Sequence, residues 1–174
     1  MPMPASPSHS KPQALRILVV DDDRAIHEDI RRVLAPPRRA GHDLAALEAL
    51  LFNGDTTASP EDDGLPTCEL LYAFQGEDAV DLLQAELEHG RPLDLAIVDM
   101  RMPPGWDGLR TVQEMWTVDP SLPVAFCTAY SDHTIEEVAA RLHRTHVPWL
   151  SKPFHSDQLK NIVRRHARGL HPVS

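Results

Sequence analysis

The stretch RILVVDDD, residues 16–23, decides the fold. Its first five residues are a short apolar run rich in β-branched side chains, which predicts a strand buried on both faces. Three aspartates follow at once, so this strand should open into a polar site. Four similar runs come later in the chain, and each is a predicted strand: residues 69–73, 95–98, 124–127 and 148–150.

Amphipathic helices are predicted between these strands. Strict alternation of buried strands with such helices predicts right-handed crossovers and one parallel sheet covered on both faces. The predicted fold is a doubly wound, five-stranded α/β domain, and such folds place their functional groups beyond the carboxyl ends of the strands. The helices are indicated by apolar residues at helical spacing, in five stripes: Ile26, Ile30, Val33 and Leu34; Ala79, Val80, Leu83 and Leu87; Leu109, Val112 and Trp116; Ile135, Val138, Ala139 and Leu142; Leu159, Ile162 and Val163.

One segment interrupts the alternation. About thirty residues, 35–67, separate the first helix from the second strand, whereas most connections are short. The apolar pattern at Leu44, Leu47, Leu50 and Leu51 predicts a short added helix, and a Gly/Asp/Thr/Pro-rich loop follows it. We interpret residues 36–67 as a surface insertion, with a partner surface or dimer arm as the alternative. The expected domain spans residues 15–170, with flexible tails at residues 1–14 and 171–174.

The composition excludes several classes of function. The chain has 174 residues, 42% of them hydrophobic, and a formal charge of −9, so its surface should repel nucleic acid and anionic lipid. No apolar run approaches the roughly 18 residues that a membrane span needs. We predict a cytoplasmic protein without nucleic-acid or membrane partners. A basic run in the last helix is interpreted as a solvated face, formed by Lys160, Arg164, Arg165 and Arg168.

Cysteine and histidine residues show no metal-ligand spacing. Cys68 and Cys127 have no neighbouring thiol, which favours a reducing compartment over a disulfide framework. The ten histidines form no zinc-type motif, so we expect them to be exposed, solvated imidazoles.

Reactive side chains coincide with the ends of four predicted strands. Residues 21–23 follow the first strand, Asp99 the third and Thr128 the fourth, and Lys152 comes just after the fifth. Carboxylates that converge at one sheet edge repel one another and need a cation, and all-oxygen ligation favours Mg²⁺. A carboxylate beside Mg²⁺ and an ammonium is placed for in-line attack on phosphorus. Asp99 stands singly on the central strand, so we predict that it is the nucleophile.

These residues resemble the receiver domains of two-component response regulators. The motifs are ILVVDDD (residues 17–23), IVDMRMPPGWDG (97–108), FCTAY (126–130) and WLSKPF (149–154). The resemblance implies a flavodoxin-like sheet of order 2-1-3-4-5, with Asp99 taking a phosphoryl group from a histidine kinase or a histidine phosphotransfer protein. It implies a phosphoacceptor that assists its own phosphorylation and dephosphorylation, not an enzyme with a separate substrate. The sequence names neither the kinase nor the downstream target.

The resemblance also implies a metal site. Asp21 and Asp22 match the acidic pair that holds Mg²⁺, with Mn²⁺ as an alternative ion. Asp99 and the backbone carbonyl of Arg101 match the remaining protein ligands. The Arg101 side chain has no part in this ligand set.

The resemblance also implies a catalytic lysine and a two-residue switch formed by Thr128 and Trp149. Thr128 matches the hydroxyl that turns toward the phosphoryl group, and Lys152 matches the ion-pairing lysine. Trp149 stands where the family has its switch aromatic residue. The expected output face comprises the fourth helix, the fifth strand and the fifth helix, through which a homodimer is also allowed.

Two features depart from the family pattern. The loop at residues 102–108 is one residue longer than usual, so its backbone path is expected to differ. Arg101 and Tyr130, each two residues beyond a reactive position, are large enough to shield an acyl phosphate from water. Slow self-dephosphorylation is therefore predicted.

Two other functions were weighed against this one. Residues 21–23 also resemble the opening motif of haloacid-dehalogenase-type phosphatases, with Asp21 as nucleophile and Asp23 as acid, but that scheme leaves Asp99 without a role. An interaction module that takes no phosphate is disfavoured, because the acids, Thr128 and Lys152 are all present. The start at Met1 favours a free-standing regulator over a segment of a longer protein.

Overall fold

Strands and helices alternate along the described chain. The computed structural model describes residues 14–35, 65–129, 135–143 and 147–168. The predicted helix around Leu44–Leu51 and most of both tails lie outside these ranges. The described elements are β1 (Leu15–Val20), α1 (Arg24–Leu34), β2 (Cys68–Ala73), α3 (Gly76–Glu88), β3 (Leu95–Asp99), α4 (Gly108–Val118), β4 (Val124–Ala129), α5 (Ile135–Leu142), β5 (Trp149–Lys152) and α6 (Ser156–His166).

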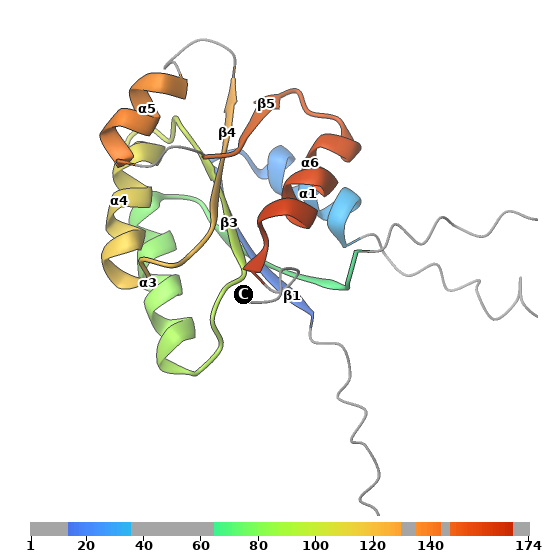
Figure 1. Cartoon of the computed structure of the whole chain (residues 1–174), viewed down its shortest axis with the longest axis horizontal. Helices are drawn as coiled ribbons and strands as arrows, with labels where there is room; N and C mark the ends of the chain where they lie inside the picture. Colours follow the sequence, from blue (N-terminus) through green and yellow to red (C-terminus); the bar gives the residue numbers. More distant parts are fainter. Residues whose placement is uncertain (1–13, 36–64, 130–134, 144–146, 169–174) are drawn as a thin grey trace, which may run out of the picture.

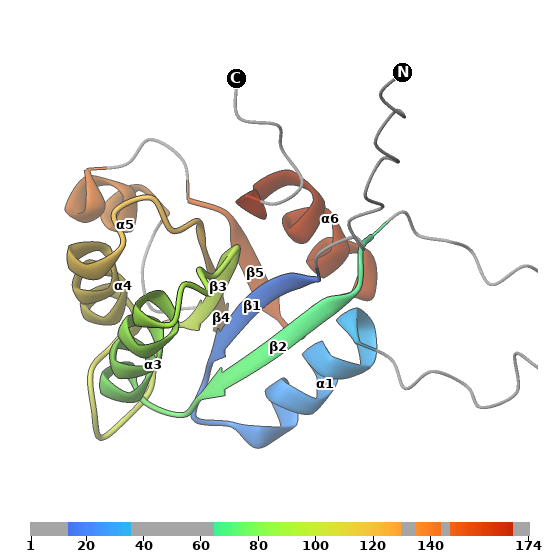
Figure 2. The same ribbon diagram turned by 90° about the horizontal axis from the view of Figure 1, so that it is seen from below.

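The five strands form one parallel sheet, as predicted. Their order is β2-β1-β3-β4-β5, with β1 in the interior and β3 at the centre. Helices α1 and α6 cover one face of the sheet, and α3, α4 and α5 cover the other (Figures 1 and 2). The predicted doubly wound fold of order 2-1-3-4-5 is thereby confirmed.

Each strand contributes side chains to two core layers, because successive residues of a strand point to opposite faces. In β1, Ile17 and Val19 pack in the layer under α1 and α6, whereas Leu18 and Val20 pack under α3, α4 and α5. The five apolar stripes supply the helical side of both layers wherever their side chains are described. Burial of these residues is the main force that holds helices to sheet.

The strands run further than predicted at their carboxyl ends. Asp99 is the last residue of β3, Thr128 lies inside β4 and Lys152 ends β5, whereas we expected all three to follow their strands. Pairing in the sheet extends to these polar residues, since Asp99 lies opposite Cys127 and Thr128 lies opposite Ser151. The reactive side chains are therefore held by strand backbone.

Two expectations about surface residues were wrong. His27 is only 6% exposed, because its ring packs on Tyr72 and Phe74. Arg168 is not part of a solvated basic face, since it binds Asp119 at 2.9 Å (Nη2 to Oδ2) and so ties the end of α6 to the loop before β4. Both contacts join segments far apart in sequence.

Both cysteines lie in the described part of the chain and form no disulfide bond. Cys68 and Cys127 are free and buried, and burial raises the pKa of these thiols to about 11 and about 12. Such thiols stay protonated and unreactive.

None of the helices described is long and apolar enough to cross a membrane.

A buried ion network lies at the amino-terminal edge of the sheet. The Arg16 guanidinium, at the start of β1, binds Glu86 of α3 at 2.6 Å and Glu69 of β2 at 3.2 Å. It also donates to the backbone carbonyl of Arg91. Arg16 is 6% exposed and Glu86 8% exposed, so each charge depends on the other.

Removal of one partner from this network should destabilise the fold. Glu86→Ala leaves the buried Arg16 with the half-exposed Glu69 as its remaining carboxylate partner, and we expect the free energy of unfolding to fall by about 3 kcal/mol, as measured by urea denaturation. Asp29→Ala is the control, since it breaks an exposed pair with Arg32 and should cost much less. Equal losses of unfolding free energy in the two variants would contradict the view that Arg16 and Glu86 form a buried pair in which each charge needs the other.

Candidate functional site

Three carboxylates converge at the carboxyl edge of the sheet. Asp21, Asp22 and Asp99 each place an oxygen within 4.8 Å of the others. Asp21 and Asp99 are almost fully buried, whereas Asp22 is exposed. Because β1 and β3 are neighbours and Val20 lies opposite Val98, the next residue of each strand faces the same space.

Lys152 bridges two of these acids. Its ammonium Nζ lies 2.6 Å from Asp21 Oδ2 and 2.8 Å from Asp99 Oδ1. Lys152 ends β5, two strands away from β3, so its long side chain reaches across the end of β4. The predicted meeting of lysine and acids is thus present in the structure.

Backbone groups hold the two buried acids in place. The Asp21 N–H donates to the Ala73 carbonyl at 3.1 Å, and Asp21 Oδ1 accepts from the Asp23 N–H at 2.9 Å. Asp99 Oδ2 accepts from the Arg101 N–H at 3.1 Å. Both oxygens of Asp99 therefore have a donor, one from Lys152 and one from the main chain.

Gly108 allows the chain to turn tightly behind Asp99. Its N–H donates to the Met100 carbonyl at 3.1 Å. A Cβ at this position would lie 2.2 Å from the Asp99 carbonyl oxygen, so a larger residue would push the end of β3 away. The motif quoted as IVDMRMPPGWDG thus ends on the residue that lets α4 begin beside Asp99.

The acid cluster carries more negative than positive charge. Burial raises the pKa of both Asp21 and Asp99 above the ordinary aspartate value, and it outweighs the opposing hydrogen bonds from Lys152. Among the described residues whose contacts to these acids are known, three carboxylates face one ammonium, which leaves the cluster with an excess of carboxylates. Oxygen-only donors and this excess charge fit a hard divalent cation such as Mg²⁺.

Within the described residues, no hydrogen bond joins Thr128 or Trp149 to the acids. The Thr128 hydroxyl donates to the Ala129 carbonyl at 3.0 Å. Trp149 packs against Phe126 with ring centroids 5.4 Å apart, and its indole nitrogen is buried without a hydrogen-bond partner in the described part of the chain. The indole thus points into the core. Tyr130, the second predicted shield, lies outside the described residues.

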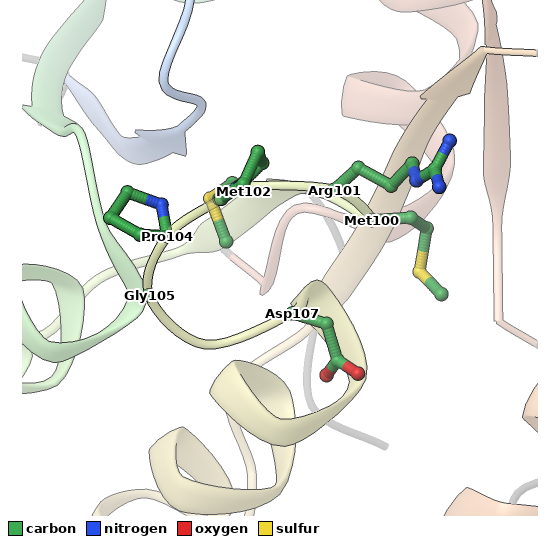
Figure 3. A pocket seen from close by; sticks show the side chains of 7 residues that line it. Met100, Arg101, Met102, Pro104, Gly105 and Asp107 are labelled. Carbon is green, nitrogen blue, oxygen red and sulfur yellow. The ribbon is translucent and has the colours of Figure 1, made fainter.

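A pocket of about 630 Å³ is lined by the loop that follows Asp99, between β3 and α4 (Figure 3). Its rim includes the exposed Arg101 and Asp107, and its floor includes the buried Met100 and Met102. The longer loop contains a cis peptide bond at Pro103–Pro104, and a second cis bond joins Lys152 to Pro153. The lining residues are Met100, Arg101, Met102, Pro103, Pro104, Gly105 and Asp107.

The backbone contacts of Ala73 and Gly108 at the site were not predicted from the sequence, and neither was the burial of His27. Ala73 and Gly108 act through backbone groups, which leave no side-chain signal. For His27 a signal existed, because residues 27, 30 and 34 share one face of a helix and all three are buried. Assignment of every histidine to the surface hid that pattern.

Comparison with known proteins identifies the family. The model of the response regulator receiver domain family matches residues 61–164. The chain is 29% identical over 150 residues to the response regulator MprA of Mycolicibacterium vanbaalenii, a match covering 86% of this chain and 49% of that protein. It is 28% identical over 158 residues to MprA of Mycobacterium avium, covering 91% and 53%. The chain therefore spans about half the length of the curated relatives it matches.

Solved structures agree at the level of the fold. A two component transcriptional regulator AraC from Clostridium phytofermentans has a TM-score of 0.60 at 20% identity, covering 90% of this chain and 95% of that one. A CheY-like receiver domain protein from Methanospirillum hungatei has a TM-score of 0.56 at 18% identity, covering 87% and 92%. The chain belongs to the response regulator receiver domain family of two-component systems.

The charge excess predicts a pH-dependent stability difference between wild type and Asp99→Asn. The pKa of Asp99 is higher in the folded protein than in the unfolded chain. Its ionised form therefore destabilises the metal-free folded protein at neutral pH. Asp99→Asn should therefore be the more stable protein at pH 7, and the difference should shrink as the pH falls through the folded pKa. Urea denaturation in a chelator, at a series of pH values, measures both. An Asp99→Asn protein less stable than wild type at pH 7 would contradict this.

Proposed function

We propose that Asp99 of this receiver accepts a phosphoryl group from a histidine kinase or histidine phosphotransfer protein. The observation that carries the proposal is the buried Asp99 carboxylate, held by Lys152 at 2.8 Å and by the Arg101 N–H at 3.1 Å, next to two further acids. A nucleophile so fixed needs no rearrangement of its own side chain before attack.

Asp21, Asp22 and Asp99 would hold Mg²⁺, with Mn²⁺ as an alternative, and the Arg101 carbonyl would complete the protein ligands. When bound, the ion would neutralise charge on the oxygens of the transferring phosphoryl group. Lys152 would supply the second positive charge from the carboxyl end of β5. The convergent oxygens within 4.8 Å support this ligand set.

In the proposed transfer, an Asp99 carboxylate oxygen attacks the phosphorus of the donor's phosphohistidine. The oxygen–phosphorus bond forms as the phosphorus–nitrogen bond breaks, and the product is an acyl phosphate on Asp99 with neutral histidine, once protonated from solvent, on the donor. The Lys152 ammonium then pairs with the added charge. No separate substrate is turned over in this scheme.

Readout is proposed to begin at Thr128. Its hydroxyl now donates to the Ala129 carbonyl, and we expect it to turn toward the phosphoryl group after transfer. Trp149 would then repack and change the face formed by α5, β5 and α6, which is the proposed surface for a downstream protein or a second copy. The receiver unit is proposed to span residues 15–170 and to work in the cytoplasm.

The phosphatase alternative finds no support in the geometry. Asp23, the acid of that scheme, caps α1, and its Oδ1 accepts from the Ala25 N–H at 2.8 Å. Asp23 is exposed, and its carboxylate is already engaged by a backbone N–H of the first turn of α1. Asp99, without a role in that scheme, is buried and accepts a hydrogen bond at each of its carboxylate oxygens.

The phosphoacceptor role is tested with a small acyl phosphate donor and Mg²⁺. Wild type should gain the mass of one phosphoryl group, and Asp99→Asn should gain none, because the amide is not a nucleophile of this kind. Asp107→Asn is a matched control on the same loop and should react like wild type. A stable phospho-adduct on Asp99→Asn, or none on wild type, would refute the role.

The lifetime of the adduct tests the shielding by Arg101. We expect slow hydrolysis in wild type, and hydrolysis several-fold faster in Arg101→Ala, because the shorter side chain opens a path for water to the phosphorus. Loss of the mass gain with time, measured after removal of donor, gives both rates. Hydrolysis of the wild-type adduct within seconds would rule the shielding out.

A further inference from the structure

His27 is a buried polar residue that the proposed function leaves unused. Its ring nitrogen Nε2 has no hydrogen-bond partner among the described residues. An unpaired buried nitrogen destabilises a fold, whereas phenylalanine or leucine would fill the same space without this cost. Packing alone therefore does not favour histidine at this position.

The ring lies between Tyr72 and Phe74, which flank the residue whose carbonyl binds the Asp21 N–H. Its centroid is 5.0 Å from that of Tyr72 and 4.7 Å from that of Phe74. Tyr72 lies in β2 and Phe74 follows the end of that strand, and the His27 ring contacts both. Ala73 lies between them, and its carbonyl accepts the Asp21 N–H at 3.1 Å.

Arg24 covers the same segment from the first turn of α1. Its guanidinium carbon lies 5.0 Å from the centroid of Phe74, the one large hydrophobic side chain found exposed in the described part of the chain. Residues 24 and 27 are three apart on the helix and so face the same way. Helix α1 and strand β2 run side by side in Figure 2, and this contact joins them at the site.

The His27 ring also lies close to the main chain of Asp21. Burial lowers the pKa of His27, while the Asp21 backbone acts to raise it. The ring therefore lies against two segments. One is the end of β2, where the Ala73 carbonyl accepts the Asp21 N–H, and the other is the main chain of Asp21 itself.

We propose that His27 is a positioning residue for the acidic pair, which it presents to the metal through its contacts with β2 and the Asp21 main chain. This inference rests on the proposed function, since it concerns the same Mg²⁺ site. The stacked rings hold the end of β2, and the ring also lies close to the Asp21 main chain, so loss of either contact should lower Mg²⁺ affinity.

The test compares Mg²⁺ affinity with stability in His27→Phe. The phenyl ring keeps the stacking and lacks the unpaired nitrogen, so the free energy of unfolding in a chelator should equal or exceed that of wild type. Mg²⁺ binding, measured by titration calorimetry, should weaken about tenfold, as is usual when a residue that orients metal ligands is lost. His89→Phe is the control, since His89 is exposed at the far end of α3 and should leave the affinity unchanged.

A second variant keeps the inference testable if His27→Phe does not fold. Phe74→Ala removes one ring of the stack at a partly exposed position, and it should also weaken Mg²⁺ binding. Wild-type affinity in whichever of these variants folds would overturn the proposal, while phosphorylation of Asp99 in wild type would still stand. Absence of Mg²⁺ binding by wild type would overturn both this inference and the metal site on which it rests.

Discussion

The contact of the Lys152 ammonium with two buried carboxylates is the interaction on which the rest of the site depends. It joins the ends of β1, β3 and β5, which are distant in sequence and meet only because the sheet has the order β2-β1-β3-β4-β5. A strand order that moved β5 away from β1 and β3 would separate the lysine from the acids. The contact thus links the topology of the domain directly to the chemistry at Asp99.

Even with this contact, the described site contains more carboxylates than ammonium groups. A third acid, Asp22, approaches the other two, and burial keeps Asp21 and Asp99 poorly solvated. The fold tolerates the excess because the backbone N–H groups of Asp23 and Arg101 bind carboxylate oxygens, and because two packed core layers hold the strand ends. A site of this kind costs stability when it holds no cation, and binding of a cation would recover that stability. That trade-off suits the proposed change of state on phosphorylation.

Much of the fold and the acid cluster could be predicted from local sequence, whereas the long-range contacts could not. Buried strands such as residues 16–20 carry a continuous apolar run, and parallel topology then brings their ends together, so the meeting of Asp21, Asp99 and Lys152 follows from short patterns. The pairing of Arg16 with Glu86 and of Arg168 with Asp119 depends on partners about fifty or more residues away, which no local pattern reveals. The same limit hid the aromatic partners of His27.

The most direct test of the central claim is to locate the phosphoryl group on the wild-type chain. Treatment of the phosphorylated protein with borohydride reduces an aspartyl phosphate to homoserine, and peptide sequencing by mass spectrometry then identifies the residue. Our account predicts homoserine at position 99 and unmodified aspartate at positions 21, 22 and 23. Homoserine at any of those three positions, with Asp99 unchanged, would contradict it.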